Sequence, residues 1–241
     1  MSMNREAERN DCFATTRWSV VLTAGGDRTH AQKALEELFQ SYWYPLYVYV
    51  RRKGYSPQDA EDHTQAFFVH VMEREMLASA QRERGRIRAF LLASLRNFLN
   101  DDRRRANALK RKAHVVSLDK AAESRYRTDA VKQETPEQAF ARQWALRCLT
   151  EVLQRLEREY ADAGKTELYE HLRCFLTNQG EAVPHAEVAK RLGKTEGAVK
   201  AAAHQFRQRY RKLLRAQIAE TVASPEDIED ELRYLISVLA R

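Results

Sequence analysis

Apolar residues recur at spacings of three and four along most of the chain, with charged residues between them. This period is typical of amphipathic helices that bury one face. Three stripes are clear: Ala60, Thr64, Phe67, Phe68, Val71 and Met72; Phe90, Leu91, Leu95, Phe98 and Leu99; and Phe140, Trp144, Cys148, Val152 and Leu156. No convincing pair of strands and no internal repeat interrupts them. The pattern predicts an all-α fold.

Three tetrapeptides mark helix starts in the same way. Ser56 to Asp59, Thr135 to Gln138 and Ser224 to Asp227 each place a hydroxyl residue before Pro, with an acceptor side chain two residues after the Pro. A hydroxyl N-cap satisfies exposed N–H groups, and Pro at the first helical position has no N–H to satisfy. The sequence therefore predicts helices that begin at the three prolines.

These signals divide the chain into two small helical bundles. The first is expected over residues 13–112, with helical segments near 18–22, 30–53, 57–76 and 87–105. Residues 113–135 are polar and mixed in charge, which predicts a flexible linker. The second bundle is expected over residues 136–222.

A C-terminal helical extension follows at residues 223–241. It has an acidic start and one apolar face, formed by Ile228, Leu232, Leu235, Ile236 and Leu239. The extension could shield a basic helix, contact a partner or cap the bundle, and capping is the interpretation we favour.

The charge of the chain is unevenly distributed. Residues 82–112 hold eleven Lys/Arg and three Asp/Glu, and residues 190–215 hold nine Lys/Arg and one Glu. Each segment carries a net +8, so with a total of +7 the rest of the chain carries −9. Two compact basic segments on an acidic chain indicate two contacts with a polyanion.

Other compositional signals narrow the class of protein. No apolar run approaches the roughly 20 residues needed to cross a bilayer. The N-terminal residues lack the apolar stretch of a signal peptide, so we expect a cytoplasmic protein with no membrane contact. Cys12, Cys148 and Cys174 are odd in number and far apart, which argues against a disulfide framework.

The strongest local signal lies between Pro184 and Leu214. A short helix with Ala186, Val188, Ala189 and Leu192 inward is followed by Gly193, where a left-handed backbone carries no side-chain penalty. Thr195 then caps a second helix. This order predicts a helix-turn-helix whose second helix enters a major groove.

The second helix is expected to have two different faces. At about 100° per residue, its apolar side comprises Val199, Ala202, Ala203, Phe206, Tyr210 and Leu213. Its other side carries the basic stripe Lys200, His204, Arg207 and Arg211, with Ala201, Gln205 and Gln208 beside it. Cations suit phosphates and guanine, amides suit adenine, and alanine leaves room for a thymine methyl group.

With these motifs the chain resembles an extracytoplasmic-function sigma factor of the sigma-70 family. The resemblance runs through residues 60–68, 84–92 and 95–105 and through the helix-turn-helix, and residues 16–22 and 42–46 resemble a subgroup. It covers about residues 13–112 and 136–222. It implies a first domain that binds RNA polymerase core and reads and melts the −10 element, and a second domain that reads the −35 element.

The resemblance also implies roles for individual residues. It assigns Asp62, Gln65 and Phe68 to the surface that binds the clamp helices in the largest subunit of core polymerase. It also implies that the second domain binds the flap of core polymerase. The −10 element is assigned Arg84, Arg86, Arg96, Asn97, Asn100, Arg103, Arg104 and Arg105, with a loop near residues 78–86 that captures an unstacked base. The −35 element is assigned Thr195, Lys200, Ala201, His204, Gln205, Arg207 and Arg211. An anti-sigma factor is a possible further partner.

Two features depart from this class. Ala202 and Gln205 stand where its recognition helices often carry Arg, so the base preference is open. The stretch from Leu168 to Val183 is longer and more polar than usual.

Two other kinds of function remain as alternatives. A helix-turn-helix regulator that does not replace the sigma subunit would explain residues 184–214, but it leaves the basic segment 82–112 without a role. An enzyme is disfavoured because the phosphate-binding, dinucleotide and zinc-protease motifs are all missing from the sequence. His171 and Cys174 are two ligands at helical spacing, short of the four of a structural zinc site. We expect no cofactor, no metal and no catalytic residue.

Overall fold

The computed structural model describes residues 28–73, 86–108, 120–129, 134–176 and 184–240. These residues fold almost entirely into helices, which confirms the all-α prediction. Within those ranges the β-type pairing is a single isolated bridge between Arg86 and Val222. None of the helices there has both the length and the apolar character needed to cross a bilayer.

The chain forms two compact units, and the first is discontinuous in sequence. The first unit comprises residues 1–147 and 218–241, and the second comprises residues 148–217. The boundaries fall inside two long helices, α8 (Pro136–Asp162) and α11 (Glu196–Ala219).

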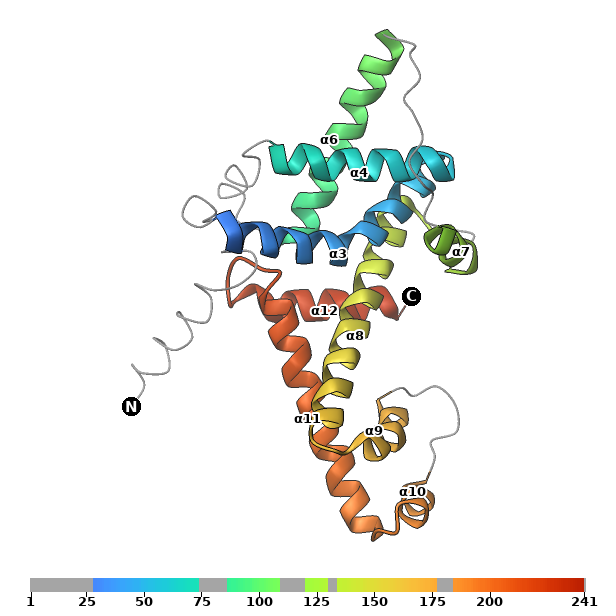
Figure 1. Ribbon diagram of the computed structural model, residues 1–241, viewed down its shortest axis with the longest axis vertical. Helices are drawn as coiled ribbons and strands as arrows, with labels where there is room; N and C mark the ends of the chain where they lie inside the picture. The colour runs from blue at the N-terminus through green and yellow to red at the C-terminus, as the bar shows by residue number, and fades with distance from the viewer. Residues whose placement is uncertain (1–27, 74–85, 109–119, 130–133, 177–183, 241) are drawn as a thin grey trace, which may run out of the picture. The chain divides into compact units, whose positions relative to one another are not determined.

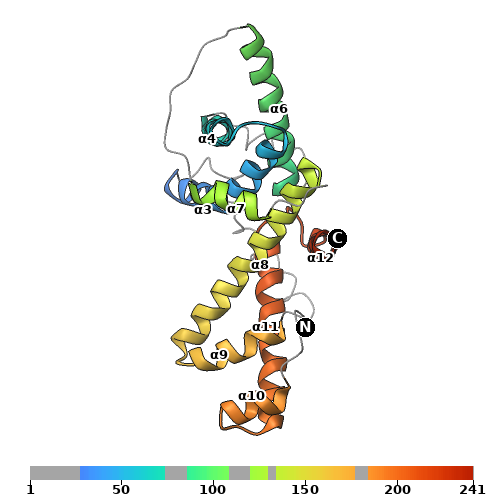
Figure 2. The ribbon, with the colours of Figure 1, turned by 90° about the vertical axis from the view of Figure 1, so that its right-hand side faces the viewer.

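In the first unit α3 (Arg28–Arg52) and α4 (Pro57–Glu73) form an antiparallel pair, and α6 (Ile87–Ala108) crosses them (Figures 1 and 2). α3 continues as a helix through Pro45, although proline in a helix interior removes a backbone hydrogen bond. It ends at Arg52, and Gly54 in the turn that follows has a φ of +93°, which only glycine adopts without strain. The predicted stripe of α4 is buried from Ala60 to Val71, and the side chain of Met72 lies outside the described residues. The Phe68 and Phe39 ring centroids are 4.4 Å apart.

Two of the three predicted helix starts are confirmed. The backbone N–H of Asp59 donates to Ser56 Oγ at 3.1 Å. Thr135 and Gln138 form a reciprocal capping box, with Gln138 N to Thr135 Oγ1 at 3.2 Å and Thr135 N to Gln138 Oε1 at 2.9 Å. These caps depend on neighbouring residues only, which is why the sequence predicts them well.

The third start was wrong by two residues. α12 (Asp227–Leu239) begins after a turn in which Glu226 N donates to Ser224 Oγ at 3.3 Å. Just before this turn the backbone is bonded to the start of α6, where Ile87 N donates to Thr221 O at 3.0 Å.

The apolar face of α12 is narrower than predicted. Ile228 and Leu235 are buried as expected, but Ile236 is 62% exposed. Glu231 takes a buried position on the inner face, with no exposed surface. An acidic residue in the core of a helix face is not what the hydrophobic pattern predicted.

The predicted linker contains a helix. α7 (Lys120–Asp129) contacts α3 through Glu123, whose side chain is only 10% exposed. Glu123 accepts from Tyr47 Oη at 2.8 Å, from Arg51 Nε and Nη2 at 3.0 and 3.1 Å, and from Arg127 Nε at 3.1 Å. Arg51 also lies 4.8 Å from the centroid of the Tyr126 ring. The polar composition of this segment concealed a specific docking contact.

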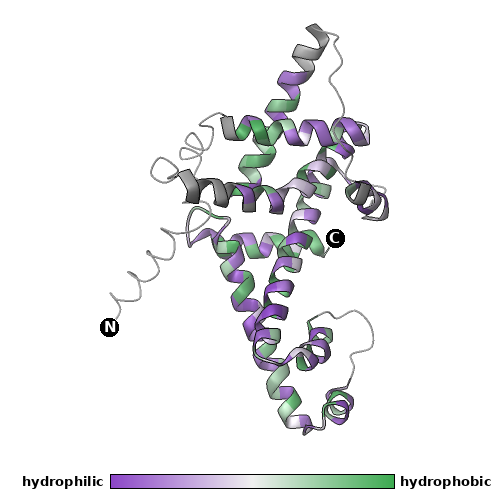
Figure 3. Cartoon of the chain, viewed as in Figure 1, coloured by the Kyte–Doolittle hydropathy of each residue, from purple (hydrophilic) through white to green (hydrophobic). Residues whose placement is uncertain are grey.

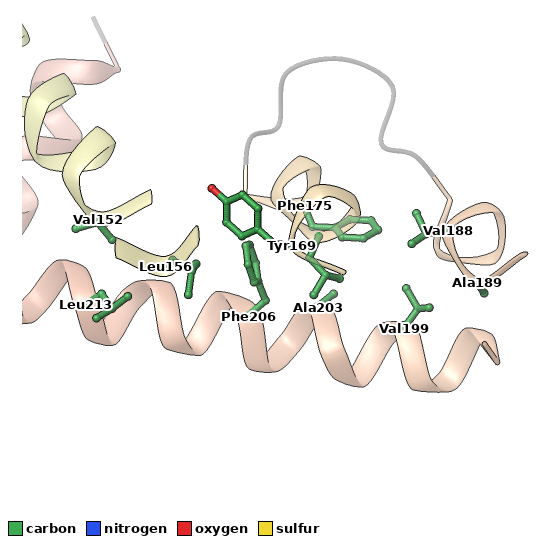
Figure 4. Close-up of a cluster of buried hydrophobic side chains, with 11 residues drawn as sticks. Val152, Leu156, Tyr169, Phe175, Val188, Ala189, Val199, Ala203, Phe206 and Leu213 are labelled. Carbon is green, nitrogen blue, oxygen red and sulfur yellow. The ribbon is translucent and has the colours of Figure 1, made fainter. Parts of the chain in front are cut away.

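The second unit is built around a single apolar cluster (Figure 4). α8 and α11 provide its long walls, and α9 (Thr166–Leu172), η2 (Arg173–Phe175) and α10 (His185–Arg191) close it. The predicted stripe of α8 is buried as expected, and so is that of α11 except for Ala202 and Tyr210, which are partly buried. Ala186 was predicted inward but is exposed, because α10 buries only Val188 and Ala189 fully.

Several predicted segments lie outside the described residues. They are the helix near residues 18–22, most of the loop near residues 78–86, the start of the linker at 113–119 and the end of the polar stretch at 177–183.

The pKa of the Glu123 carboxyl explains how pH should affect the docking of α7. Burial opposes ionisation, but the hydrogen bonds from Arg51, Tyr47 and Arg127 outweigh it and hold the pKa below its ordinary value of 4.5. A carboxyl with a depressed folded pKa contributes stability above that ordinary value. The contribution is lost as the pH falls through the folded pKa.

We predict that Glu123→Gln lowers the free energy of unfolding by about 1–3 kcal/mol at neutral pH, because it removes a partly buried charged partner. The difference from wild type should shrink below about pH 4.5. Urea unfolding at several pH values measures both effects. Glu36→Gln, on an exposed position of α3, is the matched control. Equal effects of the two variants would contradict the anchoring role of Glu123.

Candidate nucleic-acid interface

A tight turn joins α10 to α11. Gly193 has a φ of +60°, and the following Lys194 N donates to Ala189 O at 2.9 Å. Thr195 then caps α11, since its Oγ1 accepts from Ala198 N at 3.2 Å. The predicted turn glycine and the predicted cap therefore take these positions, and Thr195 has a structural partner within its own helix.

The inner face of α11 fixes the orientation of the whole helix. Val199, Ala203 and Phe206 have no exposed surface (Figure 4). The Phe206 ring lies 5.3 Å from Tyr160 of α8 and 5.8 Å from Tyr169 of α9, both in edge contacts. These contacts with α8 and α9 hold the inner face of α11 against the apolar cluster and oppose rotation of the helix.

The outer face of α11 brings together most of the residues assigned to the −35 element. Lys200, Ala201, His204, Gln205 and Arg211 are all exposed, and the ribbon alternates between hydrophilic and hydrophobic bands (Figure 3). This surface, with Gln208, is called the α11 outer face below. It offers cations, amides and a methyl group on one rigid element.

Local contacts on the α11 outer face leave these groups open to exchange. Lys200 Nζ lies 2.7 Å from Glu196 Oε1, and both side chains are about half exposed. Such an exposed pair contributes little to stability, so a phosphate can replace the carboxylate. The Nε2 atoms of His204 and Gln208 lie 2.8 Å apart.

Arg207 differs from the other predicted −35 residues. Its Nε donates to Phe175 O at 3.1 Å, and its guanidinium lies 5.9 Å from the Phe175 ring centroid. The Phe175 ring in turn stacks on His185 at 4.6 Å. Arg207 therefore ties η2 to α11 and sits at the edge of the outer face, where it helps to hold the start of α10.

An ion pair that the sequence did not predict braces the second unit. Arg209 of α11 binds Glu159 of α8 through two nitrogen atoms, at 2.7 and 2.6 Å. The hydrogen bond from Arg209 lowers the pKa of the Glu159 carboxyl, and partial burial opposes it. Arg209 and Glu159 are 50 residues apart in the sequence, so no local sequence pattern predicts that they pair.

A second candidate surface lies on α6 in the first unit. Arg96, Asn97 and Asn100, all assigned to the −10 element, are exposed. Arg96 and Asn100 line a pocket of about 170 Å³ whose other walls are Tyr49, Lys53, Tyr55 and Leu99. The two tyrosines and Lys53 come from the end of α3 and the following turn, and the sequence did not single them out as site residues. Their signal is a run of three basic residues, 51–53, between Tyr49 and Tyr55.

The pocket combines positive charge with aromatic surface. Lys53 Nζ lies 5.3 Å from the Tyr49 ring centroid and 3.8 Å from Glu137 Oε1. Tyr49 Oη donates to the same Glu137 oxygen at 3.3 Å. Burial, aided by Glu137, raises the pKa of Tyr49 to about 12, so this phenol stays neutral at physiological pH.

The remaining residues assigned to the −10 element differ in their placement. Arg84 lies outside the described residues, and so do the side chains of Arg103, Arg104 and Arg105, although α6 continues through them. Arg86 Nε lies 3.0 Å from Glu231 Oε2 of α12. Arg86 is therefore engaged by a carboxylate of its own chain.

The residues assigned to core polymerase do not all share one surface. Gln65 is exposed and Asp62 is half-buried on the outer side of α4, but Phe68 is buried in the core with 5% exposed surface. Val69 is 45% exposed, four residues after Gln65 and on the same side of the helix. Val69 is an apolar residue that lies off the core stripe in the sequence. This signal of an exposed apolar side chain was not used in the prediction.

Neither cysteine that the structure describes suggests a metal site. Cys174 Sγ donates to His171 O at 3.0 Å, and Cys148 is buried. The described part of the chain contains no group of three His, Cys, Asp or Glu residues that could hold a metal ion.

Comparison with models of known protein families, with curated proteins and with solved structures finds no match to this chain.

The geometry of α11 predicts that substitutions at two adjacent residues differ greatly in their effect on stability. Phe206→Ala should lower the free energy of unfolding by about 3–5 kcal/mol, because it removes a buried aromatic ring. Gln205→Ala, on the outer face, should change it by less than about 0.5 kcal/mol. Urea denaturation followed by circular dichroism measures both. A large loss with Gln205→Ala would mean that the outer face is not solvent-exposed.

Proposed function

We propose that this chain is a sigma factor of the extracytoplasmic-function class, which binds RNA polymerase core and directs it to promoters. The observation that carries the proposal is the division of α11 into an inner face that packs in the apolar cluster and an exposed outer face of cations, amides and Ala201. The resemblance in sequence gives this surface its partner, the −35 element of promoter DNA.

The α11 outer face suits a major groove for physical reasons. Lys200 and Arg211 can neutralise phosphates, and Gln205 can pair with a base edge. Ala201 permits close approach of the helix backbone. The short α10 and the turn at Gly193 complete the helix-turn-helix that this function requires.

The α6 surface suits a melted strand. Arg96 supplies charge, Asn97 and Asn100 supply amides, and the adjacent pocket supplies aromatic rings. Single-stranded nucleic acid is bound by this combination of cations with stacking platforms. The basic segment 82–112, which a simple regulator leaves unexplained, acquires a role in promoter opening.

The outer side of α4 suits a protein partner. Asp62, Gln65 and Val69 lie on the side opposite the core stripe, and Val69 gives that side an apolar centre. We assign this surface to core polymerase. In this assignment Phe68 supports the surface from beneath.

Because bacterial transcription takes place in the cytoplasm, the proposed function also implies that the chain acts there.

Run-off transcription with purified bacterial core polymerase and a promoter library tests the proposal directly. The full chain should produce promoter-specific transcripts and should co-elute with core in gel filtration. A regulator that leaves the sigma subunit in place would bind its DNA site without core and yield no transcript with core alone. That result would overturn the proposal.

Lys200→Ala combined with Gln205→Ala should reduce initiation about tenfold or more at promoters that have a −35 element, since each contact is worth about 1 kcal/mol or more. The matched control is Lys165→Ala with Gln154→Ala, which removes the same residue types from exposed positions elsewhere in the second unit. An equal loss on templates that lack a −35 element would contradict groove reading by α11.

Arg96→Ala combined with Asn100→Ala should reduce strand opening about tenfold, because it removes a cation and an amide from the α6 pocket. Permanganate reactivity of thymines in the holoenzyme–promoter complex measures the opening. The control is Arg173→Ala with Gln154→Ala, both exposed in the second unit. Unchanged reactivity in the α6 variant would remove this surface from the melting step.

A further inference from the structure

Two arginines at the start of α6 meet one carboxylate of α12. Arg88 Nε lies 2.5 Å from Glu231 Oε1, and Arg88 Nη2 lies 2.8 Å from Glu231 Oε2. Arg86 Nε lies 3.0 Å from the same Oε2 atom. Glu231 has no exposed surface, so its charge is compensated inside the first unit by these arginines.

The two arginines are held very differently. The Arg88 side chain is 12% exposed, and its guanidinium lies 3.7 Å from the Tyr234 ring centroid and 5.2 Å from that of Trp144. Arg86 is 29% exposed, and its second contact, at 3.9 Å, is the half-exposed carboxylate of Asp230, whose other oxygen lies 2.5 Å from Arg233 of α12. Arg88 is thus enclosed, whereas Arg86 lies at the edge of the same site.

This arrangement allows Arg86 to leave without stranding a buried charge. Removing the only partner of a buried ion is strongly destabilising, but Glu231 keeps the bidentate pair with Arg88. The pair with Asp230 is exposed and weak. The backbone need not move, because the bond from Ile87 N to Thr221 O and the bridge from Arg86 to Val222 are independent of the side chain.

We propose that Asp230 and Glu231 compete with the DNA backbone for Arg86, so that α12 lowers the affinity of the free chain for single-stranded DNA. A phosphate offers a guanidinium the same two-oxygen geometry as a carboxylate, and can therefore replace it. The inference rests on the proposed function in so far as Arg86 belongs to the basic segment that faces DNA. It assigns the acidic start of α12 a regulatory role in addition to capping.

The test uses the full chain without polymerase and a fluorescein-labelled oligothymidine of about 20 nucleotides as the probe. Asp230→Asn should tighten binding about twofold to fivefold in low salt, the range of an exposed ion pair. Glu226→Gln removes the same charge from an exposed position just before α12 and is the matched control. Glu231 is left intact, since Glu231→Gln would deprive the enclosed Arg88 of its partner.

A double-mutant cycle decides whether Arg86 carries the effect. Arg86→Gln alone should weaken binding by less than about twofold, because Arg86 is already occupied. In the Arg86→Gln background, Asp230→Asn should give no gain beyond that of Glu226→Gln. The salt dependence of wild type should be shallower than that of Asp230→Asn, by up to about 0.7 in the log–log slope.

Two results would overturn the inference: equal gains from Asp230→Asn and Glu226→Gln, or a gain from Asp230→Asn that persists without Arg86. Either can occur while promoter-specific run-off transcription is normal, and the proposed function then stands. Conversely, if the cycle behaves as expected and no promoter-specific transcript forms with core, the sigma function is wrong and the competition for Arg86 remains.

Discussion

The outer face of α11 remains in water because its inner face packs against the apolar cluster of the second unit. Phe206, between the rings of Tyr160 and Tyr169, occupies the centre of that cluster. Every contact that the second unit makes around it fixes the helix against rotation, including the bidentate pair between Arg209 and Glu159. A recognition surface on a rigid helix needs such support, because a small rotation would move cations and amides out of register with a groove.

Much of this surface follows from the sequence because it depends on local periods. A helix repeats every 3.6 residues, so apolar spacing separates the buried from the exposed side of α11 without any knowledge of its neighbours. The caps at Ser56 and Thr135 are equally local. Arg207 is exposed on α11, but its bond to Phe175 O joins residues 32 positions apart, which no local period indicates.

The features that the sequence could not predict depend on contacts between distant residues. α7 was read as part of a polar linker, yet Glu123 joins it to Arg51, 72 residues earlier. The chain before α12 pairs with a distant segment, since Ile87 N donates to Thr221 O. The pocket beside Arg96 is closed by Tyr49 of α3 and by Tyr55 in the turn after it. In each case a polar or aromatic residue gains its role from a partner that no local pattern identifies.

The bond between Arg88 and Glu231 spans 143 residues and encloses the whole of the second unit in the chain. During synthesis the second unit has all of its own residues before α12 is made, so it can fold first from short-range contacts. The first unit must wait for its last segment, and closing so long a loop is slow. Arg88, beside Trp144, therefore gains its contacts with Tyr234 and Glu231 only after α12 has been synthesised.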